Sequence, residues 1–323
     1  MADSHDGGFT HMAIRGRFHS VRSFDGTRLA WTSAGGDEGG LAVILANGIV
    51  CTDTYWTFLY PYLVEHGHKV VFWDYRAHGR SQPPANPNEV TLTSHARDLW
   101  AVADAAGVER AVLVGHSMGV QTILEAYRSS PSRVAGLVAV AGPYEHPAKT
   151  FYGAPILQSL LPFMELSVTP APSLTRAVWR SLTEQGDLLY WSGRVGRMIG
   201  DNASRELMRE YFAHLATLDP LICFRMVRAM GDHSAKDLLP EIDVPTLVLA
   251  GGKDVMTPPN LAREMAAAIP DARLEILPDG SHTLPIDDPD RINHLVDEFV
   301  SDVERGAGAR TRRTRRGRPQ PSS

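Results

Sequence analysis

Residues 112–120 read Val112-Leu-Val-Gly-His-Ser-Met-Gly-Val120. The run from Ala111 to Val114 is typical of a buried strand, and the pattern after Met118 indicates an amphipathic helix. Between them, the sequence matches G-x-S-x-G, in which a serine occupies a sharp turn from a strand into a helix. Glycines two positions before and after the serine let the strand and the helix approach closely. The stretch predicts a nucleophile at Ser117; a purely structural serine is the alternative.

The composition is that of an ordinary globular protein. The chain has 323 residues, of which 43% are apolar and 21% are charged. No apolar run approaches the ~20 residues that span a bilayer, and the polar N-terminus lacks the apolar core of a signal peptide. We therefore expect a cytoplasmic protein with no membrane span. Two distant cysteines, Cys51 and Cys223, suggest neither a disulfide framework nor a zinc site, and we expect no metal and no cofactor.

Charge is distributed unevenly along the chain. Residues 305–323 contain seven arginines and no acid, whereas the first 304 residues carry 25 basic and 37 acidic side chains, a net charge of −12. Such a tail predicts a disordered appendix, and residues 1–17 are expected to form a flexible N-terminal segment. The tail could contact nucleic acid or an anionic surface through charge attraction, but a solvated extension without a partner is favoured.

Strand and helix patterns alternate on either side of a long helical stretch. Residues 18–24 and 28–34 predict a hairpin, and the alternation continues to residue 142 and resumes from residue 244 to residue 304. Repeated strand–helix–strand units indicate a parallel sheet with helices on its faces. Residues 143–243 show no clear strand pattern. The sequence therefore predicts an α/β core formed by residues 18–142 and 244–304, with a helical insertion at residues 143–243.

A serine hydroxyl needs a base to remove its proton, and the base needs an acid to orient it. In parallel sheets such groups follow the carboxyl ends of strands. Asp254 follows the apolar run 247–250, and His282 lies in a loop after the predicted strand 273–277. A turn or helix-capping role is the alternative for Asp254. The other histidines near the elbow, in the loops and in the insertion are expected to be structural.

The negative oxygen that forms during attack on a carbonyl needs two backbone donors. The N–H of Met118 follows the nucleophile directly. The second donor is expected in the loop after the predicted strand 41–46, where Gly48 permits a tight turn and Ile49 offers its N–H. The predicted oxyanion hole therefore consists of Met118 and Ile49.

Several short motifs occur along the chain: Asn47-Gly48, Asp74-x-Arg76-x-x-Gly79-x-Ser81, Gly115-His-Ser-Met-Gly119, Gly252-x-Asp254 and Gly280-x-His282. Together they resemble the motifs of the α/β-hydrolase superfamily, serine-hydrolase branch. The resemblance covers roughly residues 18–302 and implies a mostly parallel eight-stranded sheet flanked by helices, with residues 143–243 as an inserted lid. It also implies the chain order serine, acid, histidine found here. Asn47 stands where the family often has histidine, and Ala77 where it often has glycine.

The insertion is rich in aromatic residues and methionines, which suits an apolar acyl or alcohol group. We expect the substrate pocket to include Phe151, Phe163, Trp179 and Trp191. The predicted activity is hydrolysis of esters of small to medium apolar acids or alcohols through an acyl-enzyme. A thioesterase, a lactonase, a C–C bond hydrolase and a cofactor-free haloperoxidase remain open on the same triad. A non-catalytic binding protein on the same fold is the alternative from another class.

Overall fold

The computed structural model describes residues 14, 16–36, 41–146 and 172–316. Eight strands form one sheet in the order β1-β2-β4-β3-β5-β6-β7-β8. Strand β2 runs antiparallel to both of its neighbours, and β4, β3, β5, β6, β7 and β8 run parallel to one another. The predicted mostly parallel sheet of eight strands is therefore confirmed. The strands are β1 His19–Arg22, β2 Arg28–Ala34, β3 Ala42–Ala46, β4 Lys69–Trp73, β5 Ala111–His116, β6 Val134–Val140, β7 Thr246–Gly251 and β8 Ala272–Leu277.

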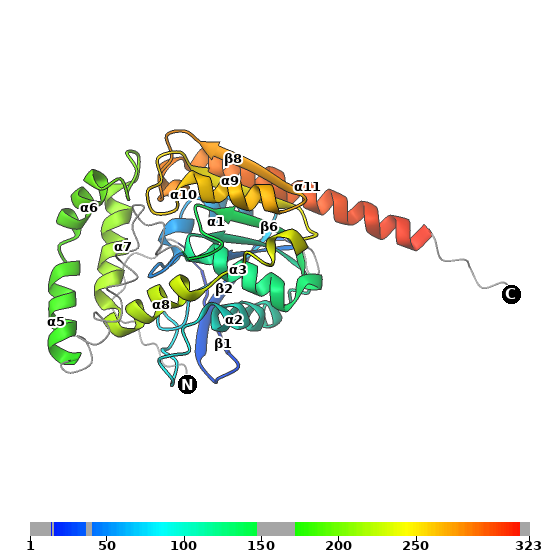
Figure 1. Ribbon diagram of the computed structural model, residues 1–323. Coiled ribbons are helices and arrows are strands. Elements are labelled where there is room, and N and C mark those ends of the chain that lie inside the picture. The colour runs from blue at the N-terminus through cyan, green and yellow to red at the C-terminus, as the bar shows by residue number, and fades with distance from the viewer. Residues whose placement is uncertain (1–13, 15, 37–40, 147–171, 317–323) are drawn as a thin grey trace.

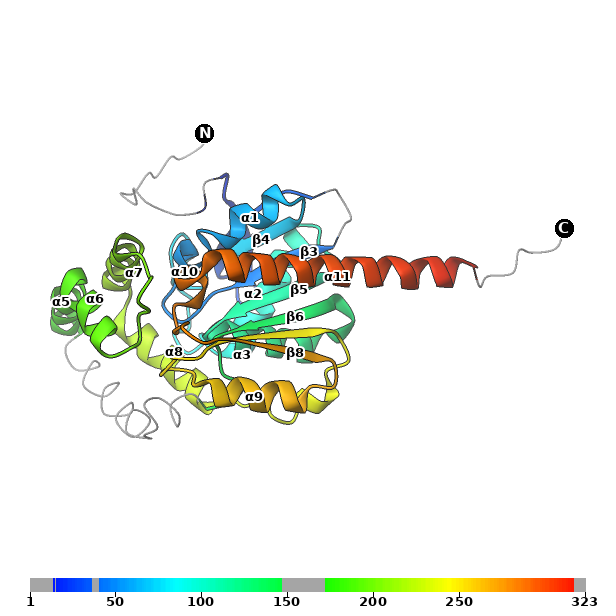
Figure 2. The same cartoon turned by 90° about the horizontal axis from the view of Figure 1, so that it is seen from above.

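Helices cover both faces of this sheet (Figure 2). Every residue of β3, β5, β6 and β7 is buried, which explains their almost uninterrupted apolar sequences. Alternate residues face opposite layers: Ile44 packs with the helices on one face, and Val43 and Leu45 with those on the other. The first layer contains α2 Leu92–Ala105, α3 Met118–Ser129 and α9 Pro259–Ala268; the second contains α1 Leu59–Glu65 and α11 Pro289–Arg316.

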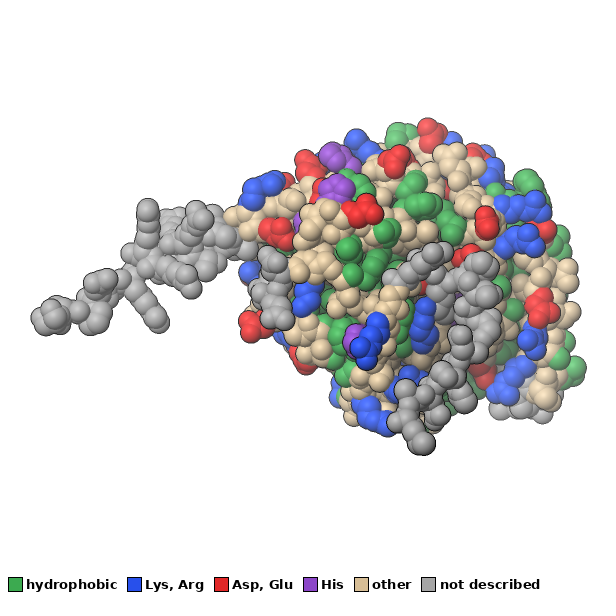
Figure 3. All heavy atoms as spheres, turned by 180° about the vertical axis from the view of Figure 1, so that it is seen from behind, with side chains coloured by type: hydrophobic (Ala, Val, Ile, Leu, Met, Phe, Trp, Pro, Cys, Tyr) green, Lys and Arg blue, Asp and Glu red, His purple; other side chains and the backbone are tan. Residues whose placement is uncertain are grey.

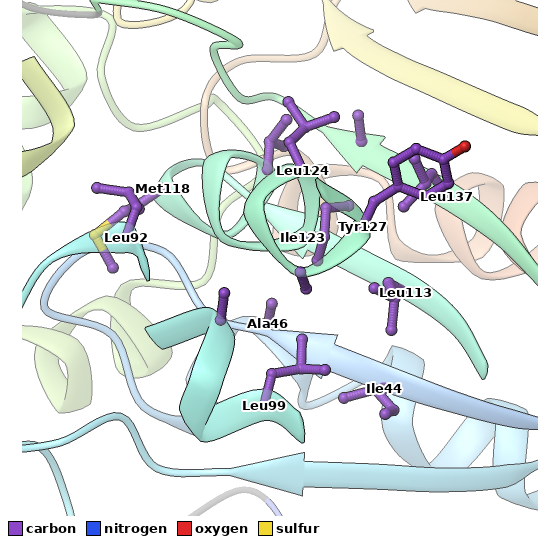
Figure 4. Close-up of a cluster of buried hydrophobic side chains, with 14 of the residues drawn as sticks. Ile44, Ala46, Leu92, Leu99, Leu113, Met118, Ile123, Leu124, Tyr127 and Leu137 are labelled. Carbon is purple, nitrogen blue, oxygen red and sulfur yellow. The ribbon is translucent and has the colours of Figure 1, made fainter. Parts of the chain in front are cut away.

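Helix α3, which follows the nucleophile, is fixed by its apolar side. Ile123 and Tyr127 lie with Leu113 of β5 and Leu137 of β6 in the cluster shown in Figure 4. All four side chains are almost fully buried. Burying each large apolar side chain contributes about 1.5–3 kcal/mol. This packing sets the position of the first turn of α3, where the chain leaves the sheet.

Helices follow β6 before the sheet resumes at β7. They are α5 Pro172–Thr183, α6 Gly186–Val195, α7 Arg205–Thr217 and α8 Pro220–Asp232. Within the described part of 143–243 there is no strand, only one isolated bridge between Glu145 and Ser234. Helices α5, α6 and α7 lie together at one end of the sheet (Figure 1).

The last helix differs from the expectation for the tail. Helix α11 does not stop at Glu304 but continues to Arg316, beyond the body of the molecule (Figure 1). The next proline, which would interrupt a helix, is Pro319. The disorder predicted for residues 305–323 stays a prediction, although the backbone of residues 305–316 belongs to α11. Residues 317–323, like residues 1–13 and 15 of the predicted N-terminal segment, lie outside the described residues.

No helix in the described ranges is long and apolar enough to cross a membrane. On the face seen in Figure 3, acidic and basic side chains are interspersed.

Candidate active site

Ser117 occupies a strained turn between β5 and α3. Its backbone has φ +54° and ψ −119°, values that a residue with a side chain rarely adopts. The neighbouring glycines permit this geometry. A Cβ on Gly115 would lie 2.3 Å from the carbonyl oxygen of Gly119, and a Cβ on Gly119 would lie 2.2 Å from that of Ala46. The turn thus requires glycine on both sides of the serine.

The structure brings Ser117, His282 and Asp254 together as the sequence predicts. The Nε2 atom of His282 lies 3.0 Å from Ser117 Oγ, and its Nδ1 lies 3.0 Å from Asp254 Oδ2. All three residues are buried. Asp254 follows β7 and His282 follows β8, and the two loops touch because the N–H of Lys253 donates to the carbonyl of Gly280. The geometry fits a relay in which His282 accepts the serine proton.

Asp254 both caps a turn and faces His282. Its Oδ1 accepts hydrogen bonds from the N–H groups of Met256 and Thr257, while its Oδ2 accepts one from the Thr257 hydroxyl. Burial acts to raise the pKa of this carboxyl, but His282 and the Thr257 hydrogen bonds outweigh it and hold the pKa below its usual range. Oδ1 thus serves the turn, whereas Oδ2 contacts both the Thr257 hydroxyl and the His282 ring.

His116 has a position that the sequence did not predict. Its Nε2 lies 2.9 Å from the main-chain carbonyl of His282, and its ring stacks on Tyr55 with centroids 4.5 Å apart. Burial, reinforced by His282, lowers the pKa of His116 to about 3, so the ring is neutral. Because the carbonyl can only accept, the Nε2 atom carries the proton. The G-x-S-x-G motif allows any residue at the position of His116, so the sequence could not indicate this contact.

The loop after β3 lies next to the nucleophile. Ile49 and Ser117 line the same cavity, and a Cβ placed on Gly48 would lie 3.3 Å from that of Ser117. Met118 is the first residue of α3. Asn47 fixes the start of this loop, because its Oδ1 accepts a hydrogen bond of 2.7 Å from the indole N–H of Trp56. Asparagine therefore holds the loop at the position where the family often has histidine.

A cavity of about 210 Å³ opens beside Ser117 and His282. Its wall is mostly apolar, and among the described residues that line it there is no Lys, Arg, Asp or Glu. The core contributes Ile49, Cys51, Tyr55, His116, Ser117, Met256, His282 and Thr283; the insertion contributes Leu189, Ser192, Gly193, Met198, Ile199, Met208, Tyr211 and Phe212. No group of three potential metal ligands is arranged to hold an ion within the described ranges.

Of the four predicted pocket residues, the two that the structure describes, Trp179 and Trp191, do not line this cavity. Trp191 is 54% exposed, on the outer side of α6. The indole N–H of Trp179 donates to the carbonyl of Leu215, and its ring meets Phe224 edge-on. Phe151 and Phe163 lie outside the described residues. The prediction for Trp179 and Trp191 is therefore corrected, because one packs inside the insertion and the other faces solvent.

Known proteins with similar sequences or structures include proteins that are hydrolases by name. RutD of Variovorax paradoxus (strain S110), named as a candidate carbamate hydrolase, is 26% identical over 83% of this chain and 94% of its own length. The esterase EaEST from Exiguobacterium antarcticum has a TM-score of 0.72 and 20% identity, with coverage of 87% and 98%. Est816, described as an N-acyl homoserine lactone degrading enzyme, has a TM-score of 0.63 and 25% identity, with coverage of 87% and 100%.

The family comparison covers most of the chain. The model of the α/β hydrolase fold family matches residues 42–289, from the start of β3 to the start of α11. This range includes the elbow, the acid, the histidine and the whole insertion. The chain therefore belongs to the α/β hydrolase fold family, and it is a hydrolase by its relatives and its fold.

Proposed function

We propose that this hydrolase cleaves small, uncharged esters with an apolar acyl or alcohol group, through an acyl-enzyme on Ser117. One observation carries the proposal: the hydrogen-bonded series Ser117–His282–Asp254, with both links at 3.0 Å, opens on an apolar cavity. A cavity of about 210 Å³ favours ligands smaller than the drug-sized molecules that fill roughly 300–1,000 Å³. The uncharged wall favours an uncharged substrate, because a buried charge without a partner is costly.

In the proposed mechanism, Ser117 Oγ attacks the carbonyl carbon while His282 Nε2 takes the hydroxyl proton. Asp254 keeps the other ring nitrogen protonated and stabilises the imidazolium. The N–H groups of Met118 and Ile49 bind the negative oxygen of the tetrahedral intermediate. His282 then gives its proton to the leaving alcohol, and a water molecule repeats the sequence on the acyl-enzyme to release the acid.

We propose that residues 143–243 act as the lid over this site. Support comes from α6, α7 and the connection between them, which supply half of the described residues that line the cavity. A cover of this kind excludes water, and electrostatic interactions with the reacting groups become stronger when water is excluded.

Other substrates of the same reaction class need separate tests. Thioesters, lactones and activated C–C bonds next to a ketone all offer a carbonyl to Ser117, and peroxide could replace water in a cofactor-free haloperoxidase. RutD is named for carbamates, whose free form is an anion; the uncharged wall favours neutral esters over that anion. A panel with one neutral member of each class and free carbamate would rank these activities by kcat/KM.

The test of the proposal is turnover of short p-nitrophenyl esters by Ser117→Ala and His282→Ala. We expect each variant to lose about 10⁶ in kcat, because members of a triad act as a unit. Ser130→Ala is the matched control, since Ser130 lies at the opposite end of α3 and should leave kcat unchanged. Retention of more than about 1% of the wild-type rate by Ser117→Ala would reject this serine as the nucleophile.

A further inference from the structure

We propose that Asp287 is a positioning residue for His282, an inference that rests on the proposed function. Asp287 ends the short helix α10 (Leu284–Asp287), five residues after His282. Its side chain is 7% exposed, and it is a different acid from Asp254, which contacts the imidazole. Sequence reasoning did not single it out.

The Asp287 carboxylate binds the residues on both sides of His282. Its Oδ2 accepts hydrogen bonds from the Ser281 N–H at 3.1 Å and from the Ser281 hydroxyl at 2.5 Å. Its Oδ1 accepts one from the Thr283 hydroxyl at 2.8 Å. Hydrogen bonds to an ionised carboxylate are stronger than those between neutral groups. One side chain thus connects the two neighbours of the histidine.

Two further contacts complete the support of the main chain at 281–283. The Thr283 N–H donates to the Ser281 hydroxyl oxygen at 3.1 Å, and the ring of His116 donates to the His282 carbonyl. The peptide group that follows His282 is therefore held by side chains at both its carbonyl and its N–H. With the main chain fixed, the imidazole has its direction set before a substrate enters. Errors of about 1 Å in the position of a catalytic group can cost ~10² in rate.

The same carboxylate also meets the insertion. The Gly200 N–H, in the connection between α6 and α7, donates to the Thr283 hydroxyl oxygen at 2.9 Å. A Cβ on Gly200 would lie 2.0 Å from Asp287 Oδ2, so only glycine fits there. Residues 198 and 199, directly before it, line the cavity. Asp287 and Thr283 thereby connect the cavity wall to the loop that carries the base.

The first experiment compares Asp287→Asn with Asp288→Asn. The amide has one acceptor oxygen and presents N–H groups to donors, so the bonds to Ser281 and Thr283 cannot all form. We expect kcat for short esters to fall about 10²-fold with KM little changed. Asp288 is the matched control, because it is the next residue, is exposed and should keep wild-type kcat.

A spectroscopic signature separates positioning from a general loss of fold. The proton on His282 Nδ1, between the ring and Asp254, gives a low-field NMR resonance that depends on this hydrogen bond. We expect Asp287→Asn to shift or broaden it at a temperature where the variant is folded, and Asp288→Asn to leave it unchanged. An unchanged resonance together with wild-type kcat in Asp287→Asn would overturn the inference.

A double-mutant cycle with Ser281→Ala guards against a variant that folds poorly. Ser281 shares its hydrogen bond with Asp287, so we expect the double variant to lose clearly less kcat than the product of the two single losses. Independent losses that multiply would overturn the inference. Failure of the proposed function looks different: the wild type itself would then lack esterase activity, while the NMR comparison could still be made.

Discussion

The core and the insertion meet at one cavity but supply different groups to it. The core contributes the hydroxyl, both imidazoles and the loop of Ile49. The insertion contributes mainly apolar side chains, from Leu189 to Phe212. Because the core holds the reacting groups, we expect substitutions in the core to alter the rate of the chemical step for every substrate. Changes in the insertion alter which substrate is preferred.

Apart from the loss of Ser117 or His282, the largest expected effect comes from a single atom of the core. In Asp254→Asn, the amide can no longer keep the proton on His282 Nδ1, and the imidazole adopts the wrong tautomer. We expect kcat to fall about 10⁴-fold for all esters of a chain-length series, with the order of preference unchanged. Steady-state measurement of kcat for each ester of the series, in the wild type and in Asp254→Asn, tests this expectation.

The control for Asp254→Asn is Asp279→Asn in the same pair of loops. Asp279 is exposed, and its carboxylate pairs with Lys253 instead of His282. We expect wild-type rates from it. A loss that varies from ester to ester in Asp254→Asn would remove the distinction between the two regions.

A smaller effect is expected from two adjacent leucines of the insertion. Leu189 lines the cavity, whereas Leu188 is 66% exposed on the other side of α6. Leu189→Ala enlarges the cavity, so we expect kcat/KM to shift roughly 10- to 100-fold in favour of longer acyl chains. Leu188→Ala should leave the preference unchanged. Equal behaviour of the two variants, measured on p-nitrophenyl esters of increasing length, would contradict a selective role for the insertion.

The smallest effect on turnover is expected from a core carboxylate that lies away from the cavity. Asp74 is fully buried, and burial raises its pKa to about 6 although Arg80 opposes this. The folded chain therefore binds this proton more tightly than the unfolded chain does. The stability contributed by Asp74 is complete below its ordinary pKa of 3.8 and is lost as the pH rises through about 6.

Denaturant unfolding of wild type and Asp74→Asn measures this contribution. Relative to the variant, the wild type should lose up to about 3 kcal/mol of unfolding free energy between about pH 4 and pH 6.5, and at each pH the two proteins should have the same kcat. A large loss of kcat in Asp74→Asn would mean that Asp74 takes part in catalysis and is not a purely structural residue of the core. An opposite slope with pH would mean that the pairing with Arg80 outweighs burial.

The catalytic residues of the core could be predicted from the sequence. Ser117, Asp254 and His282 follow strands whose apolar runs are easy to recognise, and parallel strands carry such residues to a common edge. The loop from Asp74 to Ser81, whose motif belongs to the family resemblance, contains charged residues that are paired in the structure. Arg80 pairs with Asp74, and the fully buried Arg76 pairs with Asp98. Thr91 caps α2 by accepting a hydrogen bond from the Ser94 N–H, as its sequence context indicates.

The walls of the cavity could not be predicted in the same way. On α5 and α6, apolar residues occur on more than one side of the helix, and periodicity does not say which side faces the nucleophile. Six of them face outward: Leu174, Val178, Leu182, Leu188, Trp191 and Val195. Asp287 was missed because an aspartate shortly before a helix, here α11, resembles a capping residue. Its contact with Gly200, 87 positions earlier, depends on tertiary structure alone.

Covalent labelling tests the central claim most directly. An activated fluorophosphonate reacts with a serine only where a base and an oxyanion hole are in place, and intact-protein and peptide mass spectrometry identify the modified residue. We predict one adduct per chain on Ser117, absent from Ser117→Ala and strongly slowed in His282→Ala. Folded wild-type protein that forms no adduct, or that carries it on another residue, would contradict the account.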